Sequence, residues 1–185
     1  MIEFDQQVQY LIFDRASQNI SKRLPKTISF SNDINEQARK DIEKLKEERK
    51  IDWDFIFKLD SPFMEWVSNQ QHPITAVIYY GESSERFCIG YMLGSVNFDK
   101  AAIELNYIAK RHDAHNDLKY QFFPSTLEVL FTYAQALNSE KSCIEKIALI
   151  SPLDYVIPYY QKYGFELDKN YTTETINVMT ANLQK

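Results

Sequence analysis

The sequence predicts a mixed α/β fold, in which helices cover the faces of one central sheet. Four segments have the short apolar or alternating pattern of strands, at residues 74–80, 87–98, 102–110 and 146–150. Between the last two, apolar residues recur at helical spacing over 123–137. A helix that connects two strands of one sheet allows them to run parallel, whereas short turns make neighbours antiparallel. We therefore expect a mixed and mostly antiparallel sheet.

The length and composition indicate a single domain over residues 1–185. The chain has 185 residues, of which 44% are apolar and 25% charged. These values are typical of a globular protein with one continuous core. No internal repeat, low-complexity tract or Gly/Ser-rich linker divides the sequence. We expect one compact unit with no boundary inside it.

Charge and hydropathy exclude several classes of protein. The formal net charge is -5, which argues against a broad nucleic-acid surface because phosphate binding needs clustered Lys and Arg. No apolar segment approaches the roughly 18 residues that cross a bilayer. No signal peptide is visible, so we expect a cytoplasmic protein without a membrane partner. Cys88 and Cys143 are too few for a disulfide framework, and we expect buried or inert thiols.

The N-terminal third predicts one strand and two helices. Residues 7–14 have a strand-like pattern, and a helix is expected to begin near Asp33, where Asp33 and Glu36 fit a capping signal. Ser61 followed by Pro62 indicates the start of a second helix, with Ser at the cap and Pro in the first turn.

The remaining connections follow from turn and helix signals. The polar residues 81–86 are typical of a hairpin turn, and residues 111–120 of a loop. A further helix is predicted over 154–163, followed by strands near 165–167 and 175–181.

One short motif carries a family resemblance. Residues 159–165 read Tyr-Tyr-Gln-Lys-Tyr-Gly-Phe and follow the buried strand 146–150. This Tyr-x-x-x-Gly-Phe helix end, together with the element order over 7–181, resembles the GNAT superfamily of acyl-CoA-dependent N-acetyltransferases. The resemblance implies a GNAT-like acyl-CoA N-acyltransferase fold with two splayed parallel central strands, 102–110 and 146–150. It also implies acetyl transfer from acetyl-CoA to a primary amine by direct attack.

The resemblance also indicates where acetyl-CoA would bind. In the family, the pantetheine arm pairs with strand backbone near the splay, and a glycine-rich loop before the long helix holds the pyrophosphate. The loop positions fall on Leu118, Gln121 and Phe123, so both glycines are missing, and only flanking cations could compensate. The residues expected to contact the cofactor are Ile108, Ala109, Lys110, Arg111, Lys119, Gln121, Phe122, Phe123 and Ser151.

Two residues are candidates for catalysis. Tyr160 occupies the position of the tyrosine that serves many of these enzymes as general acid, and a phenol is protonated at neutral pH. Glu104 is the candidate base, and strand alternation is expected to place it on one face with Asn106 and Ile108. A purely structural role stays open for both side chains.

Other functions remain open. The missing glycines favour, as an alternative, a GNAT-fold protein with weak or lost CoA binding that acts as a regulatory, ligand-sensing or partner-binding domain. The amine acceptor is not identified by the sequence; its pocket is expected from the 14–32, 50–60 and 168–176 segments. The resemblance allows a homodimer. His112 and His115 lack a third ligand at a recognisable spacing, so we expect no metal.

Overall fold

A computed structural model describes residues 6–60, 72–82, 85–140 and 143–183 of the chain. The second predicted helix, from Ser61 onward, lies outside the described residues. The helices are α1 (Gln6–Ser21), α2 (Glu36–Glu47), α3 (Phe55–Asp60), α4 (Phe122–Ser139) and α5 (Ile157–Gln161). The strands are β1 (Ile28–Ser31), β2 (Pro73–Tyr80), β3 (Phe87–Asn97), β4 (Ala102–Lys110), β5 (Lys146–Ile150), β6 (Glu166–Leu167) and β7 (Val178–Asn182).

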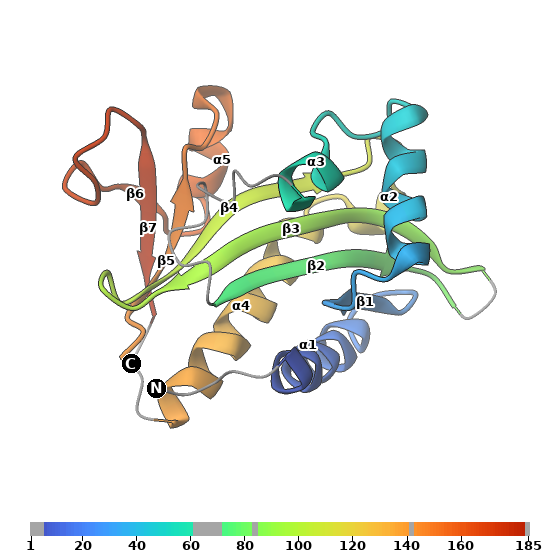
Figure 1. Ribbon diagram of the computed structural model, residues 1–185, viewed down its shortest axis with the longest axis horizontal. Helices are drawn as coiled ribbons and strands as arrows, with labels where there is room; N and C mark the ends of the chain where they lie inside the picture. The colour runs from blue at the N-terminus through green and yellow to red at the C-terminus, as the bar shows by residue number, and fades with distance from the viewer. Residues whose placement is uncertain (1–5, 61–71, 83–84, 141–142, 184–185) are drawn as a thin grey trace.

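The strands form one mixed sheet in the order β1-β2-β3-β4-β5-β7-β6 (Figure 1). Among the described strands, β4 and β5 are the one parallel pair, and α4 is the crossover helix between them. The other five pairs are antiparallel. The expected mixed sheet with a parallel central pair is therefore confirmed.

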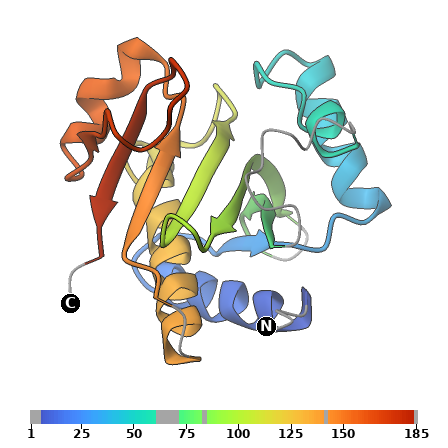
Figure 2. The ribbon, with the colours of Figure 1, turned by 60° about the vertical axis from the view of Figure 1, so that its left-hand side comes forward.

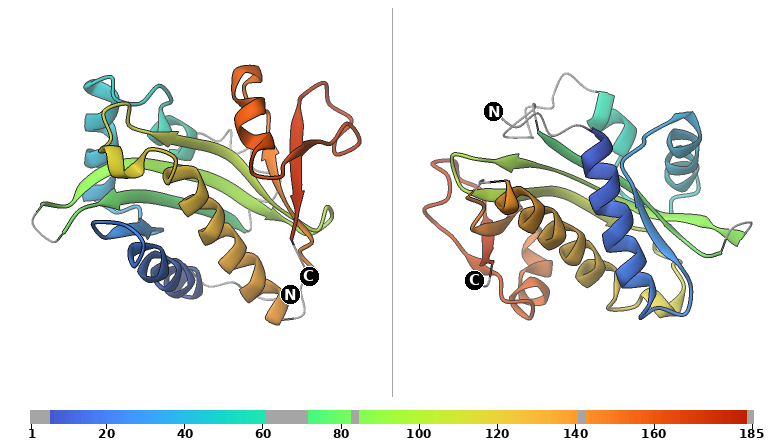
Figure 3. Two further views of the ribbon diagram at one scale, coloured as in Figure 1. Left: turned by 180° about the vertical axis from the view of Figure 1, so that it is seen from behind. Right: turned by 90° about the horizontal axis from the view of Figure 1, so that it is seen from below.

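Helices cover both faces of the sheet. α1 and α4 lie side by side against one face, as the two views of Figure 3 show, and α2 and α3 lie over the other. Phe13 of α1 and Tyr133 of α4 join the first layer through an edge-to-face contact with ring centroids 5.9 Å apart. Tyr91 of β3 packs against Phe55 of α3 in the second layer, with ring centroids 4.6 Å apart.

The predicted strand at residues 7–14 is wrong, because this segment belongs to α1. The buried residues of α1 recur every three or four positions and form one helical face: Gln9, Phe13, Ala16, Ser17 and Ile20. The strand-like pattern came partly from Val8 and Tyr10, which are exposed on either side of the buried helical face. Ile28–Ser31, placed within a loop by the sequence, supplies the first strand instead.

Two further details differ from the predictions in the N-terminal half. The N-cap of α2 is Asn35, whose side chain accepts a hydrogen bond from the Ala38 amide, rather than Asp33. The 50–60 segment is not wholly a loop, since it contains α3.

The helix predicted at 154–163 begins with a 3₁₀ turn, Asp154–Val156, and continues as α5.

The outer edge of β1 is closed by two serines of α1. The Phe30 amide donates to Ser17 Oγ at 3.0 Å, and the Ile28 amide donates to Ser21 Oγ, also at 3.0 Å. Ser21 lies one helical turn after Ser17, so both hydroxyls face the same strand edge. Backbone donors that an edge strand normally offers to another strand are satisfied within the chain.

The parallel pair separates halfway along β4. The ladder between β4 and β5 joins Ala102 to Lys146 and ends where Leu105 pairs with Leu149. β4 continues to Lys110, still paired with β3, whereas β5 ends at Ile150. Figure 2 shows the two strands diverging beyond this point. The expected splayed strands are therefore confirmed.

A β-bulge in β4 changes which side chains share a face. Leu93 pairs with Tyr107, but Gly94 pairs with Leu105, so Asn106 is the extra residue. Leu105 and Ile108 consequently both pack on the face covered by α1 and α4. Glu104 points to the opposite face, which it shares with Tyr107. The expectation that Glu104 and Ile108 share a face is wrong, because the extra residue shifts the alternation.

The two cysteines differ in their burial. Cys88 is buried, and burial raises the pKa of its thiol to about 12, as expected of an inert cysteine. Cys143 is exposed, so only one of the two thiols is buried. Across the residues described, every helix is too short or too polar to cross a lipid bilayer.

Candidate active site

A cavity of about 1030 Å³ opens where β4 and β5 separate. Its walls come from β4 from Glu104 onward, the end of β5 and the residues after it, and Tyr160 of α5. The 3₁₀ turn before α5, the 171–178 segment, the 52–58 segment and the turn after β3 complete them. Residues of the 50–60 and 168–176 segments line this cavity, whereas the 14–32 segment does not. The cavity therefore lies at the opening between the two strands.

The cavity brings together six of the eleven residues that the sequence singled out. These are Glu104, Ile108, Ala109, Lys110, Ser151 and Tyr160. The other five do not line it: Arg111, Lys119, Gln121, Phe122 and Phe123. All five lie just beyond β4 or at the start of α4, where the sequence placed the pyrophosphate.

The second half of β4 presents one backbone edge to the cavity. The Arg111 amide donates to the Ile89 carbonyl of β3 at 2.8 Å. Successive amides of a strand point to opposite edges, so those of Lys110 and Ile108 point away from β3. β5 does not pair with β4 beyond Leu105 and leaves that edge open. A linear molecule with its own amides could pair there as an added strand.

Glu104 is a buried carboxylate held by neutral donors. Its side chain belongs to a residue that is 4% exposed. Oε1 accepts a hydrogen bond from Asn97 Nδ2 at 2.8 Å and another from the Tyr171 hydroxyl at 2.7 Å. Burial and the hydrogen bond with Glu104 both raise the pKa of Tyr171, so the phenol stays protonated and acts as donor.

Tyr160 lies on α5 among aromatic rings. Its ring centroid is 4.7 Å from that of Phe123 and 5.6 Å from that of Tyr159. Burial, and to a smaller extent Tyr155, raises the pKa of Tyr160, which keeps the phenol protonated. Phe123 packs directly against this ring and helps to position Tyr160.

Ser151 has an unusual backbone conformation at the end of β5. Its φ of 51° is in the left-handed region, which is uncommon for residues other than glycine and often occurs at functional sites. The Ser151 amide donates to the Asn177 carbonyl at 2.9 Å, which fixes the turn. The chain therefore leaves the sheet abruptly beside the open edge of β4.

The start of α4 offers few donors for a phosphate. The Gln121 amide already donates to the Leu118 carbonyl at 3.1 Å, and Pro124 has no N–H. The side chains of Phe122 and Phe123 are buried, 6% and 5% exposed. Only the amides of these two residues remain at the N-terminus of the helix, compared with four in an ordinary helix.

The two cations near the start of α4, Arg111 and Lys119, differ in their surroundings. Arg111 forms a two-pronged ion pair with Asp113, with nitrogen–oxygen distances of 2.5 and 2.8 Å. This guanidinium holds the pKa of Asp113 well below its usual range. Lys119 is exposed, and its ammonium lies 5.3 Å from the centroid of the Tyr120 ring. An anion would have to compete with Asp113 for Arg111.

Several cavity residues were not predicted. Tyr171 was missed because only the fold places it against Glu104, 67 residues away in sequence. Lys58 and Trp53 were treated as parts of a loop, but the Lys58 ammonium lies 5.1 Å from the Trp53 ring centroid inside the cavity. Their residue types carry no signal in the sequence that could have identified them.

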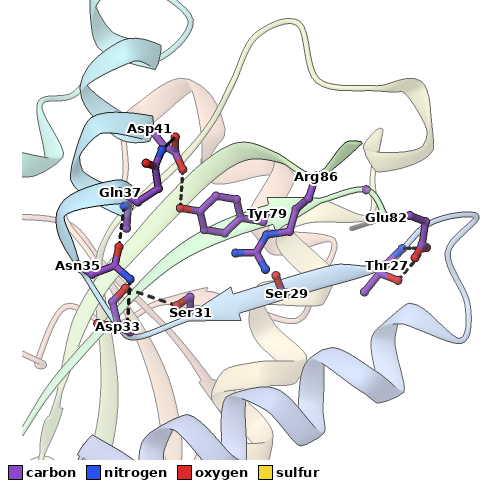
Figure 4. Close-up of a pocket in the computed structure, with 12 residues that line it drawn as sticks. Thr27, Ser29, Ser31, Asp33, Asn35, Gln37, Asp41, Tyr79, Glu82 and Arg86 are labelled. Atoms are coloured by element: carbon purple, nitrogen blue, oxygen red, sulfur yellow. Dashed lines mark hydrogen bonds between the residues drawn. The ribbon is translucent and has the colours of Figure 1, made fainter. Parts of the chain in front are cut away.

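A second, smaller groove lies between β1 and α2 (Figure 4). It has a volume of about 650 Å³ and is lined by polar side chains. Most of these are engaged with one another: Tyr79 donates to Asp41 at 2.9 Å, and Thr27 donates to Glu82 at 2.8 Å. The Arg86 guanidinium stacks 4.1 Å from the centroid of the Tyr79 ring. No predicted site residue lies in this groove.

Comparison with solved structures identifies the fold. A protein from Klebsiella pneumoniae described as an acyl-CoA N-acyltransferase superposes with a TM-score of 0.53 at 14% identity, over 86% of this chain and 99% of that one. A GNAT-family acetyltransferase from Staphylococcus aureus gives 0.53 at 16% identity, over 86% and 99%. A mutant spermidine N-acetyltransferase from Vibrio cholerae gives 0.50 at 14% identity, over 85% and 93%.

These comparisons define the class of the fold. The chain has the fold of the GNAT acyl-CoA N-acyltransferases, which confirms the resemblance seen in residues 159–165 and in the element order. Neither a protein-family model nor a curated protein sequence matches the chain. Identities of 14–16% show the fold alone, so any activity has to be argued from the site.

Proposed function

We propose that this protein is an acyl-CoA-dependent N-acyltransferase that moves an acetyl group from acetyl-CoA to a primary amine. The observation that carries the proposal is the open edge of β4 beyond Leu105, beside a cavity that Glu104 and Tyr160 both line. The amides of Ile108 and Lys110 pair with the pantetheine arm. Ala109 and Ser151 flank it on the two strands.

The chemistry is a direct transfer. The amine loses a proton to Glu104, directly or through water, and its nitrogen lone pair attacks the thioester carbonyl carbon. The carbon–sulfur bond breaks, and the Tyr160 phenol gives its proton to the departing CoA thiolate. The raised pKa of Tyr160 keeps that proton in place until the thiolate forms. Phe123 holds the phenol ring in position.

The pyrophosphate of CoA is bound more loosely than the pantetheine arm. The amides of Phe122 and Phe123 at the start of α4 contact it, and Gln121 closes that end of the loop. Arg111 and Lys119 add positive charge nearby. Two backbone donors at this helix start, the amides of Gln121 and Pro124, are occupied or absent, and each charge-assisted hydrogen bond to the pyrophosphate would contribute about 1.5–3 kcal/mol. The affinity for acetyl-CoA therefore depends mainly on the open edge of β4.

Binding of acetyl-CoA is the direct test. Ligand at about 100 times its dissociation constant stabilises the native state by about 2.7 kcal/mol, which thermal unfolding detects. Lys110→Pro removes the open-edge amide without touching the β3 ladder, and Lys110→Ala removes only the side chain. We expect binding to weaken far more in the proline variant. Equal acetyl-CoA affinity of the two variants would contradict strand-edge binding.

The start of α4 favours a second candidate function. At this helix start the Gln121 amide is occupied, Pro124 has no N–H, and both phenylalanines are buried. These features suit a GNAT-fold protein that has lost CoA binding and acts as a regulatory, ligand-sensing or partner-binding domain. No thermal shift and no calorimetric heat with millimolar acetyl-CoA would favour this alternative over the enzyme.

A further inference from the structure

An uncompensated ammonium group lies in the cavity. Lys58 of α3 places its Nζ 3.6 Å from the centroid of the Tyr107 ring and 5.1 Å from that of Trp53. All three side chains line the cavity. Within the described parts of the chain, Lys58 forms no salt bridge. The two rings hold the ammonium by cation–π attraction and leave its hydrogen-bond donors available.

The carboxylates that line the cavity, those of Glu104, Asp52 and Glu174, have surroundings that differ from those of Lys58. Glu104 is buried and already accepts hydrogen bonds from Asn97 and Tyr171. Asp52 lies 3.2 Å from Nε2 of His112. Glu174 is exposed on the loop before β7. None of these carboxylates neutralises Lys58, so an anionic group of a ligand is the natural partner of this ammonium.

The bulge in β4 sets the distance between Lys58 and Glu104. Because Asn106 is the extra residue, Tyr107 lies on the same face as Glu104. Glu104 pairs with Ser95 and Tyr107 with Leu93, so the bulged segment between them spans only two residues of β3, about 7 Å. Lys58 rests on Tyr107, so the cavity offers a base and a cation about that far apart along β4.

We propose that the acceptor carries an acidic group about 7 Å from its reactive amine, with the amine at Glu104 and the acid at Lys58. This inference rests on the proposed function and adds the substrate class to it. Lys100 supports it from the other side of Glu104, since its ammonium lies 5.6 Å from the Tyr171 ring centroid in the same cavity. Lys58 is thus a specificity-determining residue.

The test uses three peptides of equal length: Ala-Ala-Asp-amide, Ala-Ala-Asn-amide and Ala-Ala-Arg-amide. Each has one free α-amine, and the third side chain is acidic, neutral or cationic. Binding to the full chain is measured by calorimetry, and acetyl transfer by release of the CoA thiol. We expect the acidic peptide to bind about tenfold more tightly than the neutral one, as for one charge-assisted hydrogen bond.

Variants assign that preference to Lys58. Lys58→Gln should remove it and Lys58→Arg should keep it. Lys22→Gln, in the turn just after α1 and outside the cavity, is the matched control and should bind like the parent protein. Equal binding of the acidic and neutral peptides, preference for the cationic peptide, or an unchanged preference in Lys58→Gln would each overturn the inference.

Calorimetry separates this inference from the proposed function. Selective binding of the acidic peptide without any acetyl transfer would support Lys58 as an anion contact while removing the transferase activity. Acetyl transfer to all three peptides with equal affinity would leave the transferase and remove the acidic acceptor.

Discussion

The hydroxyl of Tyr171 lies 2.7 Å from Oε1 of Glu104 and ties the loop before β7 to the middle of β4. The contact is buried, and Asn97 donates to the same oxygen from the end of β3. Three segments distant in sequence therefore converge on one carboxylate. Its second oxygen takes part in neither of these bonds, which suits a group that must accept a proton from an amine.

Replacement of Glu104 should separate its chemical role from its structural one. Glu104→Gln keeps the shape and an acceptor for Tyr171, so we expect a native fold and acetyl transfer slowed by about a hundredfold, as for loss of a general base. Glu104→Ala leaves the buried donors of Asn97 and Tyr171 unsatisfied and should also cost about 1–3 kcal/mol of stability. Steady-state kinetics and urea unfolding measure the two effects. Full activity of Glu104→Gln would exclude the base role.

Loss of the Tyr160 hydroxyl should slow the chemical step. In Tyr160→Phe the ring still packs against Phe123, and we expect kcat to fall about a hundredfold with little change in acetyl-CoA affinity. Tyr163→Phe is the matched control, because its ring also contacts Phe123, at 5.3 Å, but lies outside the cavity. A Tyr160→Phe protein that turns over acetyl-CoA at the parent rate would contradict the acid role.

The stability of the protein should fall in alkali, partly through Tyr80. Burial, followed by the hydrogen bond to Asp117, raises the pKa of Tyr80 to about 12. An unfolded tyrosine has a pKa of about 10, so the native state holds this proton more tightly. The stabilisation is complete below pH ~10 and is lost as pH rises toward 12. Urea unfolding at pH 8 and 11 should show a smaller loss for Tyr80→Phe than for the parent protein.

An added methyl group at Gly94 should disturb the bulge. A Cβ there would lie 2.1 Å from the backbone oxygen of Glu104, so β3 or β4 would have to move. We expect Gly94→Ala to lower both the melting temperature and turnover, because it displaces Glu104. Gly164→Ala serves as the contrast: φ is +82° but nothing lies within 4 Å, so it should cost about 1–2 kcal/mol without affecting Glu104.

The serine at position 17 should stabilise the fold measurably. Ser17→Ala leaves the buried Phe30 amide without its acceptor, at an expected cost of about 1–3 kcal/mol in urea unfolding. Ser139→Ala, at the exposed end of α4, should change stability by less than about 0.5 kcal/mol. A neutral Ser17→Ala substitution would mean that water replaces the hydroxyl at this edge.

The sequence predicted the strands of the central sheet well. Each of β2, β3, β4 and β5 has a long apolar pattern that the fold buries, and the crossover helix fixes the parallel pair. The first helix was missed because its polar buried residues, Gln9 and Ser17, do not look like core positions. Their partners, the Pro73 carbonyl and the Phe30 amide, are backbone groups that no sequence pattern announces.

The sequence predicted the residues of the site only where their place in the order of helices and strands determines their position. Tyr160 and the end of β4 follow from their place in the element order, and all line the cavity. The bulge at Asn106 carries no proline or glycine in its own strand, so the change of face at Tyr107 could not be foreseen. Contacts such as Lys58 with Tyr107 arise from segments far apart in sequence, which only the folded chain brings together.

The two ends of the sheet limit how copies of this chain can associate. At one end the hydroxyls of Ser17 and Ser21 already occupy amides of β1. At the other, β6 has only two residues, Glu166 and Leu167, and the first is charged. A second molecule finds no long vacant strand to copy at either boundary, so the native protein should resist fibre growth by strand addition even at high concentration.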